Sequence, residues 1–342
     1  MVRIKKGPSK TISIEDVARL SGVSITTVSR VINKIPSVKE KNRIRVQEVI
    51  EQLKFQPSVF AQRLATGKSN VVALVIPRYE GIFYSFYALE LIRGIGTLCV
   101  ALKLDLLLHL ADSRSQLNLK GAGGIIFADI ISNRNQLQEA LANSIPSIVI
   151  NNYVQDLEVS CISIDNVGGA ESAVNYLISL GHCKIAHITG DLITQAAVQR
   201  LQGYKKALEK NKLSLNEDYI LKTDYSRGQA RAAAEKLLKM PNPPTAAFVA
   251  SDSMALEVMA VARELDKDVP EDLSIVGFDD NPSGLYGPVA LTTVRQPLVK
   301  MAQDSVRELN LLMKSEKKAQ SPKKIILPTE LVIRESCRPL NP

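Results

Sequence analysis

The sequence predicts an α/β protein in which a small all-α domain precedes a larger domain built on parallel sheets in two similar lobes. Three observations predict this fold class. Three short helical patterns occupy the first part of the chain, β-branched runs alternate with amphipathic helices after it, and the two parts differ in charge. Runs that are apolar on both faces and that alternate with helices are typical of parallel sheets.

The charge of the chain is concentrated at one end. The first 70 residues hold 14 Lys+Arg against 5 Asp+Glu, a net charge of +9, whereas the remaining 29 Lys+Arg and 30 Asp+Glu leave −1. These two values agree with the +8 of the whole 342-residue chain. The small domain is therefore expected to meet a polyanion, and the large domain is not.

Several protein classes are not supported by the composition. No apolar run reaches the roughly 18 residues of a membrane span, so no membrane partner is expected. The basic start "MVRIKKGPSK" leads into no apolar segment, which argues against a signal peptide. The four cysteines are scattered, and reduced thiols in a cytoplasm are the simplest interpretation.

The first helix is predicted over Ile14 to Leu20. Ser13 can act as its N-cap, and Asp16 places an anion in the first turn, where the helix dipole favours one. Gly22 permits a turn directly after this helix.

The second helix is predicted over Ile25 to Asn33, with Ser24 as its cap. It carries a polar stripe without an acidic residue. A turn followed by a second helix with such a face indicates a helix-turn-helix, whose second helix lies in the major groove of DNA. A helical hairpin buried in a core would not explain the polar stripe or the local positive charge. The stripe comprises Thr26, Ser29, Arg30 and Asn33.

A third helical pattern runs from about Glu40 to Leu53, and Pro57 ends it. A single short helix from Ser58 to Leu64 is predicted next, before Gly67 breaks it. The apolar side of the third helix is formed by Ile44, Val46, Val49, Ile50 and Leu53.

From Val71 onward, strands and helices alternate. Strands are predicted to start at Val71, Asp105, Gly123, Ser147, Lys184, Ala246 and Leu273, in two sets of about four. Ligands of such folds bind beyond the carboxyl ends of the strands. Those ends carry Asn151, Asn152, Ser251, Asp252, Asp279 and Asp280. Only about a dozen residues separate the strands that start at Asp105 and Gly123, which leaves room for one turn of helix at most.

The chain resembles the lactose-repressor (LacI/GalR) family of bacterial transcription regulators. The resemblance rests on "TISIEDVARLSGVSITTVSRVIN" and continues through "GHCKIAHITGD", "AAFVASDSMALEVM", "LSIVGFDD", "LTTVRQP" and "LPTELVIRES". It covers nearly the whole chain, with the motifs in the order of the family. It implies a helix-turn-helix domain with a hinge helix, followed by a domain like a periplasmic binding protein.

The resemblance assigns DNA contacts to individual residues. Ile25, Thr26 and Arg30 correspond to base-reading positions, and Arg30 can donate two hydrogen bonds to a guanine. By its spacing alone Ile25 belongs with the apolar side of its helix, so the two interpretations of this residue differ. Phosphate contacts are expected from Thr27, Ser29, Asn33, Lys39 and Asn42.

Lys39 and Asn42 stand where the family commonly has a serine and a threonine. A lysine cannot accept a capping hydrogen bond, so Lys39 is expected to act as a point charge. In the hinge, Ala61, Gln62 and Leu64 correspond to minor-groove positions, with Leu64 as the wedge between base pairs. Gln62 stands where many members have arginine.

For the large domain the resemblance implies a small ligand between the lobes. The matching positions are Asn151, Arg200, Tyr225, Ser251 and Asp279, a set that suits a sugar or polyol. Two structural alternatives stay open at this point: an ion pair between Asp279 and Arg200, and a core position for Tyr225.

These observations predict a ligand-responsive transcriptional regulator, a repressor, that acts as a cytoplasmic homodimer on a pseudo-palindromic DNA operator. The predicted division is residues 1–56 for DNA binding, 57–70 for the hinge and 71–342 for ligand binding and dimerisation. The first lobe is expected at about 71–164 plus 295–322, and the second at about 165–294 plus 323–342.

No catalytic residue, metal site or cofactor is predicted, because no P-loop, GxSxG elbow or metal-ligand spacing occurs. Three other functions are kept as alternatives: a sugar-binding receptor, an enzyme of sugar metabolism with a fused DNA-binding module, and a DNA-binding protein that needs no ligand.

Overall fold

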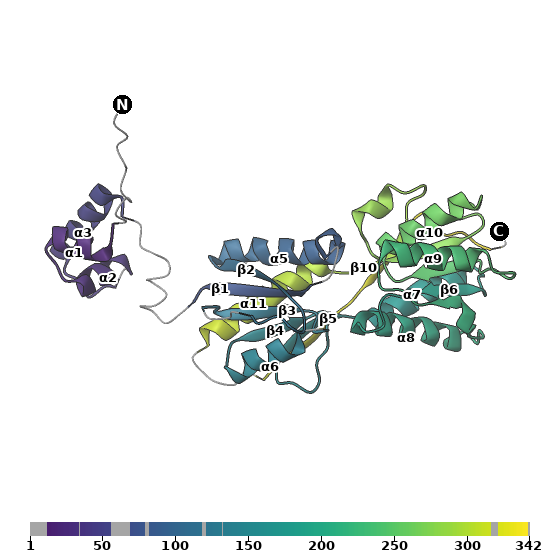
Figure 1. Ribbon diagram of the computed structural model, residues 1–342, viewed down its shortest axis with the longest axis horizontal. Coiled ribbons are helices and arrows are strands. Elements are labelled where there is room, and N and C mark those ends of the chain that lie inside the picture. The colour runs from purple at the N-terminus through teal and green to yellow at the C-terminus, as the bar shows by residue number, and fades with distance from the viewer. Residues whose placement is uncertain are drawn as a thin grey trace, which may run out of the picture. The chain divides into compact units, whose positions relative to one another are not determined.

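The computed structural model describes residues 12–33, 35–55, 69–78, 82–117, 121–131, 133–315 and 321–340. The chain forms two compact units, Met1–Ser69 and Asn70–Pro342 (Figure 1). Each unit is described by itself below.

The first unit is a bundle of three helices: α1 (Ile14–Ser21), α2 (Ile25–Ile32) and α3 (Glu40–Leu53). Ser13 and Asp16 form a reciprocal capping box at the start of α1, and Gly22 ends this helix with φ at 66°. A left-handed residue is needed there, and glycine adopts that conformation without a Cβ clash. The predicted caps and turn are therefore confirmed.

The core of this bundle is small and aliphatic. Val17, Val28 and Val46 are fully buried between the helices. Ile44, which was predicted on the apolar side of α3, is instead 48% exposed, and Leu20 on α1 is 52% exposed. Both lie on helices of a bundle that has too few layers to cover more than one side of each helix. The predicted helix from Ser58 to Leu64 lies outside the described residues.

The second unit contains two six-stranded sheets (Figure 1). The first sheet has the order β11-β5-β4-β3-β1-β2, and all its neighbouring strands are parallel. Its strands are β1 (Val71–Pro77), β2 (Asp105–Ala111), β3 (Gly124–Ala128), β4 (Ser147–Ile150), β5 (Ser160–Ile164) and β11 (Lys324–Leu327).

The second sheet has the order β12-β10-β9-β8-β6-β7, in which only the β10–β12 pair is antiparallel. Its strands are β6 (Ile185–Ile188), β7 (Ile220–Leu221), β8 (Ala246–Val249), β9 (Ser274–Asp279), β10 (Thr292–Arg295) and β12 (Glu330–Val332). Strands of the central layer such as β8 are buried on both faces, as parallel strands between two helix layers must be.

Helices cover the faces of both sheets (Figure 1). The first lobe carries α5 (Phe86–Leu102), α6 (Arg134–Ala142) and α11 (Leu298–Lys314). The second lobe carries α7 (Asn166–Ser179), α8 (Gln195–Lys210), α9 (Arg227–Leu238) and α10 (Asp252–Glu264). Three short 3-10 turns, η1 (Ile82–Tyr84), η2 (Glu217–Tyr219) and η3 (Pro282–Leu285), complete the described elements.

The structure corrects two expectations about the lobes. Each sheet has six strands rather than about four, because short strands such as β7 and β12 carry little periodic signal. The segment Lys324–Leu327, which was expected in the second lobe, pairs with β5 in the first sheet.

The chain therefore passes between the lobes three times: after β5, after β10 and after β11. The short connection from β2 to β3 contains no helix in its described residues 112–117 and 121–123, as the sequence predicted.

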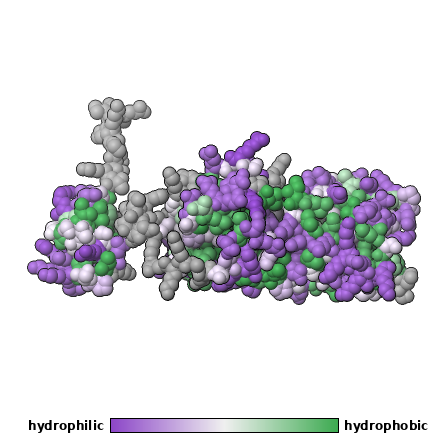
Figure 2. Space-filling view, turned by 90° about the horizontal axis from the view of Figure 1, so that it is seen from below, coloured by the Kyte–Doolittle hydropathy of each residue, from purple (hydrophilic) through white to green (hydrophobic). Residues whose placement is uncertain are grey.

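On the face of the second unit that Figure 2 shows, hydrophilic and hydrophobic residues alternate in small groups. No helix within the described ranges is long and apolar enough to cross a membrane.

Candidate functional site

The first site is the outward face of α2. Ile25 is 48% exposed, and Thr26 and Arg30 are exposed beside it. Val28 and Val31 take the inward side of the same helix. The structure thus places Ile25 on the surface with the polar stripe rather than in the core, although its spacing alone favoured the core.

Other residues of this face are tied to the helix itself. The Ser24 Oγ caps α2 by accepting a hydrogen bond from the Thr27 amide at 3.2 Å, and it also lies 3.0 Å from the Thr27 Oγ1. Asn33 donates to the Ser29 Oγ at 3.4 Å. These hydroxyl and amide groups are held in place on the exposed turn, where a phosphate oxygen can reach them.

The start of α3 lacks a side-chain cap. Lys39 occupies the N-cap position and makes no capping hydrogen bond, as its chemistry predicts. Its ammonium group is exposed and Asn42 is partly exposed in the first turn. No side chain caps the first turn of α3, and the N-terminal end of a helix favours an anion. Ala61, Gln62 and Leu64, the predicted minor-groove residues, lie outside the described residues.

The second site lies between the lobes and centres on Arg200. This side chain is 4% exposed. Its Nε donates to the Asn166 Oδ1 at 2.9 Å, its Nη1 donates to the Ala250 carbonyl at 2.6 Å, and its Cζ lies 3.7 Å from the centre of the Phe278 ring. The guanidinium is therefore fixed by two hydrogen bonds and a cation–π contact.

Asp279 faces Arg200 from the end of β9. Its carboxylate accepts a hydrogen bond from the Gln296 amide. Burial raises the pKa of Asp279 above its usual range, and the charge of Arg200 opposes this rise. No ion pair within 4.0 Å joins these two described side chains, so the alternative of a simple structural ion pair is not what the structure shows.

The structure adds Asp129, which sequence reasoning missed. It follows β3, and Asn151 follows the neighbouring parallel strand β4. The Asn151 Nδ2 lies 3.1 Å from both carboxylate oxygens of Asp129. Burial raises the pKa of Asp129 to about 6, against the opposing effects of Asn151 and of the positive charge of Arg200. A carboxylate directly after a buried strand was the signal available in the sequence.

Tyr225 and Ser251 complete the predicted ligand residues. The Tyr225 ring occupies the space above Gly190, since a Cβ on that glycine would lie 1.9 Å from the Tyr225 Cζ. Tyr225 is partly exposed, so it is not a fully buried core residue. Burial raises the pKa of its hydroxyl, and the positive charge of Arg200 partly opposes this rise. Ser251 caps α10 by accepting from the Met254 amide at 3.4 Å, so its hydroxyl has a structural role.

Several of these site residues also have a positive φ, which is uncommon for residues other than glycine. Ten described non-glycine residues have a positive φ, and five of them follow helix C-termini. The other five gather at the carboxyl ends of strands: Asp129 (62°), Asn151 (65°), Tyr225 (67°), Asp279 (127°) and Asp280 (58°). Strained backbone persists where the surrounding structure enforces it, and it clusters at functional sites.

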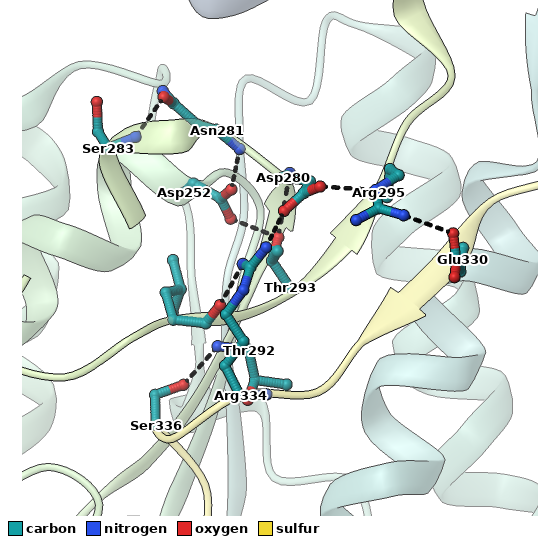
Figure 3. A network of polar contacts seen from close by, with 11 residues as sticks. Asp252, Asp280, Asn281, Ser283, Thr292, Thr293, Arg295, Glu330, Arg334 and Ser336 are labelled. Atoms are coloured by element: carbon teal, nitrogen blue, oxygen red, sulfur yellow. Dashed lines mark hydrogen bonds and ion pairs between the residues drawn. The ribbon is translucent and has the colours of Figure 1, made fainter. Parts of the chain in front are cut away.

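A polar network holds Asp280, which directly follows β9 (Figure 3). Asp280 pairs with Arg295, whose Nε lies at 2.6 Å, and with Arg334 from the neighbouring chain segment. Burial alone would raise the pKa of Asp280, but the two arginines bring it below its usual range. This pairing fixes the backbone that aims Asp279 at the cleft.

The same network buries a third carboxylate. Asp252 accepts from the Thr293 hydroxyl at 2.6 Å and from the Asn281 amide at 2.7 Å (Figure 3). Burial and the nearby Asp279 both raise its pKa. Asp252 therefore helps to hold Thr293 of β10 and the backbone of Asn281 in place.

Two cavities flank the Arg200 cluster. A cavity of about 470 Å³ borders Tyr153, Asn166 and Gln199, and one of about 290 Å³ borders Phe86, Asp279 and Gln296. Of the five predicted ligand residues only Asp279 lines either cavity. The other four do not line either cavity. Among the described residues no group of three or more His, Cys, Asp or Glu could hold a metal ion.

Comparisons with known proteins identify the fold and its relatives. Residues 13–58 match the model of bacterial regulatory proteins of the lacI family, and residues 174–337 match a periplasmic binding protein-like domain. The HTH-type transcriptional regulator DegA of Bacillus subtilis (strain 168) is 35% identical over 340 residues, which cover 96% of this chain and 99% of DegA. The chain belongs to the lacI family of bacterial regulatory proteins.

Two further relatives of this lacI-family protein are informative. Catabolite control protein A of Priestia megaterium is 34% identical over 316 residues, covering 89% of this chain and 93% of that protein. A transcriptional regulator CelR–cellobiose complex has a TM-score of 0.72 at 28% identity and covers 95% of this chain and 99% of its own. The predicted family, fold class and function as a DNA-binding transcriptional regulator are thus confirmed.

Proposed function

We propose that this lacI-family regulator is a homodimeric repressor that acts in the cytoplasm and whose affinity for a pseudo-palindromic DNA operator depends on a small ligand bound between its lobes. The observation that carries the proposal is the buried position of Arg200 in the second lobe, where its positive charge acts both on Asp129 of the first lobe and on Asp279. A ligand that contacts both lobes favours one arrangement of them, and it can thereby shift the DNA-binding equilibrium.

The DNA part of the proposal assigns base reading to Ile25, Thr26 and Arg30. Their side chains project from an exposed helix face whose other members, Ser29 and Asn33, hydrogen-bond to each other. An arginine presents the paired donors that match a guanine edge, and Ile25 offers an apolar contact such as a thymine methyl accepts. The minor-groove role of Ala61, Gln62 and Leu64 remains a prediction.

A second copy of the chain is proposed to cover the outer edge of the first lobe. β2 is the last strand of its sheet, and Leu107, Leu108 and Leu110 on it are 43%, 37% and 37% exposed. On the adjacent α5, Leu89 and Val100 are 50% and 79% exposed. An apolar edge strand left open invites pairing with another chain, so a stable partner surface explains this composition.

Selection of DNA sites by the full-length protein tests the DNA-reading assignment. The wild type should enrich a palindromic sequence, and Arg30→Ala should lose the preference at one symmetric pair of positions. Binding to unrelated DNA should persist in the variant and weaken with salt, because phosphate contacts do not depend on Arg30. An unchanged preferred site in Arg30→Ala would refute the assignment.

The rival functions make different predictions. A sugar-binding receptor with no regulatory function would enrich no DNA sequence. A ligand-independent DNA-binding protein would bind its operator with the same affinity whether or not a ligand is present. The exposed polar face of α2 with Arg30 favours the first part of our proposal. The second part is favoured by the buried Asn151 Oδ1 and Gln296 Oε1, which accept no hydrogen bond from the described residues.

A further inference from the structure

We infer that Asn166 is a positioning residue that couples Arg200 to the three connections between the lobes, and that these connections move as one unit because polar contacts join each of them to the next. The inference rests on the proposed function, since it concerns how the same interlobe site transmits its ligand state.

The three connections between the lobes are short. They are Asp165 after β5, Gln296–Pro297 after β10 and Pro328–Thr329 after β11. A rearrangement of the lobes has to change backbone dihedral angles at a few such positions, since the sheets on either side are rigid. Contacts among the connections therefore decide whether each of them can change alone.

Hydrogen bonds join the first connection to the third. The Asp165 amide donates to the Leu327 carbonyl at 2.9 Å, and the Thr329 Oγ1 donates to the Asp165 carbonyl at 3.4 Å. The space around this hydroxyl is closed, because a Cβ on Gly169 would lie 2.7 Å from the Thr329 Oγ1. A shift of Asp165 would therefore disturb the third connection.

An ion pair joins the third connection to the second. Arg295 directly precedes the second connection, and Glu330 directly follows the third. The two residues face each other in the β10–β12 pair, and the Arg295 Nη1 lies 2.9 Å from the Glu330 Oε2 (Figure 3). The Arg295 Nε also donates to Asp280 at 2.6 Å, so the same side chain reaches the residue next to Asp279.

Each charged residue at the two ends of these contacts is bonded to a connection or to its neighbour. Arg200 donates its Nε to the Oδ1 of Asn166, which directly follows Asp165. Asp279 accepts from Gln296, which belongs to the second connection. Arg200 and Asp279 thus lie at the two ends of one continuous set of contacts that includes all three connections.

Asn166 uses both ends of its amide. Its Oδ1 accepts from the Arg200 Nε at 2.9 Å, its Nδ2 donates to the Gln199 Oε1 at 3.2 Å, and the residue is 1% exposed. An arginine only donates hydrogen bonds, so this arrangement determines which end of the amide faces Arg200. A buried hydrogen bond to a charged group is strong. The guanidinium therefore cannot move without breaking this bond or carrying the start of α7 along.

Hydrogen–deuterium exchange of the full-length protein tests the coupling, because coupling is shown by a distant response to a local change. Asn166→Leu removes both amide bonds at similar volume. Exchange should accelerate about fivefold or more in peptides that span β10 and β12, although among the described residues the Asn166 side chain bonds only to Gln199 and Arg200. Peptides from α10 should exchange as in the wild type, since they report opening of the whole lobe.

Two further variants keep the test independent of that one substitution. Asn166→Asp retains an oxygen that faces Arg200 and should restore most of the protection. Glu330→Gln breaks an ion pair whose acidic side chain is 67% exposed, so the fold should tolerate it. It should accelerate exchange of the Asp165 amide, because a coupling between two positions acts in both directions.

Two control substitutions remove the same kinds of contact away from the connections. Asn175→Leu removes an amide of α7 that accepts a hydrogen bond from Asn211 at 2.8 Å. Glu264→Gln removes an ion pair with Arg231, between α10 and α9. Both variants should leave exchange at all three connections as in the wild type.

Wild-type exchange in β10 and β12 of Asn166→Leu, or wild-type exchange of the Asp165 amide in Glu330→Gln, would overturn the inference. Acceleration in α10 to the same extent would do so too, since the effect would then be a general loss of stability. Affinity for the palindromic DNA that the wild type enriches separates this inference from the proposed function. Faster exchange at the connections with unaltered DNA affinity would support the coupling and count against control of DNA binding by the lobes.

Discussion

At the scale of single residues, Asp129 illustrates how the burial of a carboxylate costs stability at neutral pH. Its carboxylate accepts a hydrogen bond from Asn151 and feels the positive charge of Arg200, and burial raises its pKa from the usual 3.8 to about 6. The folded protein therefore binds this proton more tightly than the unfolded chain does. The contribution of Asp129 to stability is fully present below about pH 4 and is lost as the pH rises through about 6.

The variant Asp129→Asn should not show this loss of stability as the pH rises. Between pH 4 and pH 7 the free energy of unfolding of the variant, relative to the wild type, should rise by up to about 3 kcal/mol, because a shift of roughly two pKa units corresponds to that energy. Urea denaturation at several pH values measures it, with Asp266→Asn as the control, because Asp266 also has a left-handed backbone but is exposed. Parallel pH profiles for wild type and Asp129→Asn would show that burial of this charge carries no penalty.

Some of these residues could be assigned from the sequence, and others only from the fold. Ser13, Gly22 and Ser24 were predictable as caps and a turn, since each acts on its own neighbours in the chain. Asp129 needed the pairing of β3 with β4, which brings it beside Asn151 across 22 positions of sequence. The exposure of Ile25 needed the packing of α2 in three dimensions, because spacing alone put it with the core residues.

At the scale of elements, regular helices were predictable and short strands were not. The bounds of α3 agree with the predicted range from about Glu40 to Leu53, since a long helical pattern carries its own signal. β10 and β12 are short and partly polar, and their pairing joins residues such as Thr293 and Val332 that lie far apart in sequence. β11 joins the first sheet by pairing with β5, and no local pattern in the sequence predicts this pairing.

The start of α8 carries a contact that bridges the lobes. Gln195 accepts a hydrogen bond from the Tyr153 amide at 2.6 Å and donates one to the Tyr153 carbonyl at 3.1 Å. Tyr153 follows β4 in the first lobe, whereas α8 belongs to the second. The Gln195 side chain thus satisfies both the backbone N–H and the backbone carbonyl of Tyr153 in the opposite lobe. These hydrogen bonds favour the close approach of the two lobes.

Gln195→Ala should loosen this approach. With about 1 kcal/mol for each hydrogen bond, exchange of the Tyr153 amide hydrogen should accelerate about tenfold or more. Hydrogen–deuterium exchange followed by mass spectrometry or NMR measures it. The control is Gln229→Ala on α9, since that side chain bonds to Asp224 within the second lobe. An unchanged exchange rate at Tyr153 would mean that other contacts hold the lobes together.

At the scale of the whole molecule, the division of charge and surface separates the tasks of the chain. The first unit holds the excess positive charge, whereas the second is close to neutral and contains the buried polar cluster and an apolar sheet edge. Each proposed task would thus have its own physical basis: charge and an exposed helix for DNA, buried hydrogen-bonding groups for the ligand, and apolar area for assembly.

Assembly should decide how strongly the protein holds a palindromic operator. Val100 is 79% exposed on α5, so Val100→Glu adds a charge to the proposed partner surface without disturbing the core. Sedimentation should show at least a tenfold weaker dimer. Affinity for a full palindrome should then fall far more than affinity for a half-site, because a dimer binds its second half-site as a linked event and a monomer cannot.

The control places the same substitution on the other lobe. Ile193 is 74% exposed near the start of α8, and Ile193→Glu should leave both sedimentation and palindrome binding as in the wild type. Equal losses for half-site and palindrome in Val100→Glu would point to damage within one subunit. An unaltered dimer in that variant would show that the α5–β2 edge is not the surface through which two copies meet.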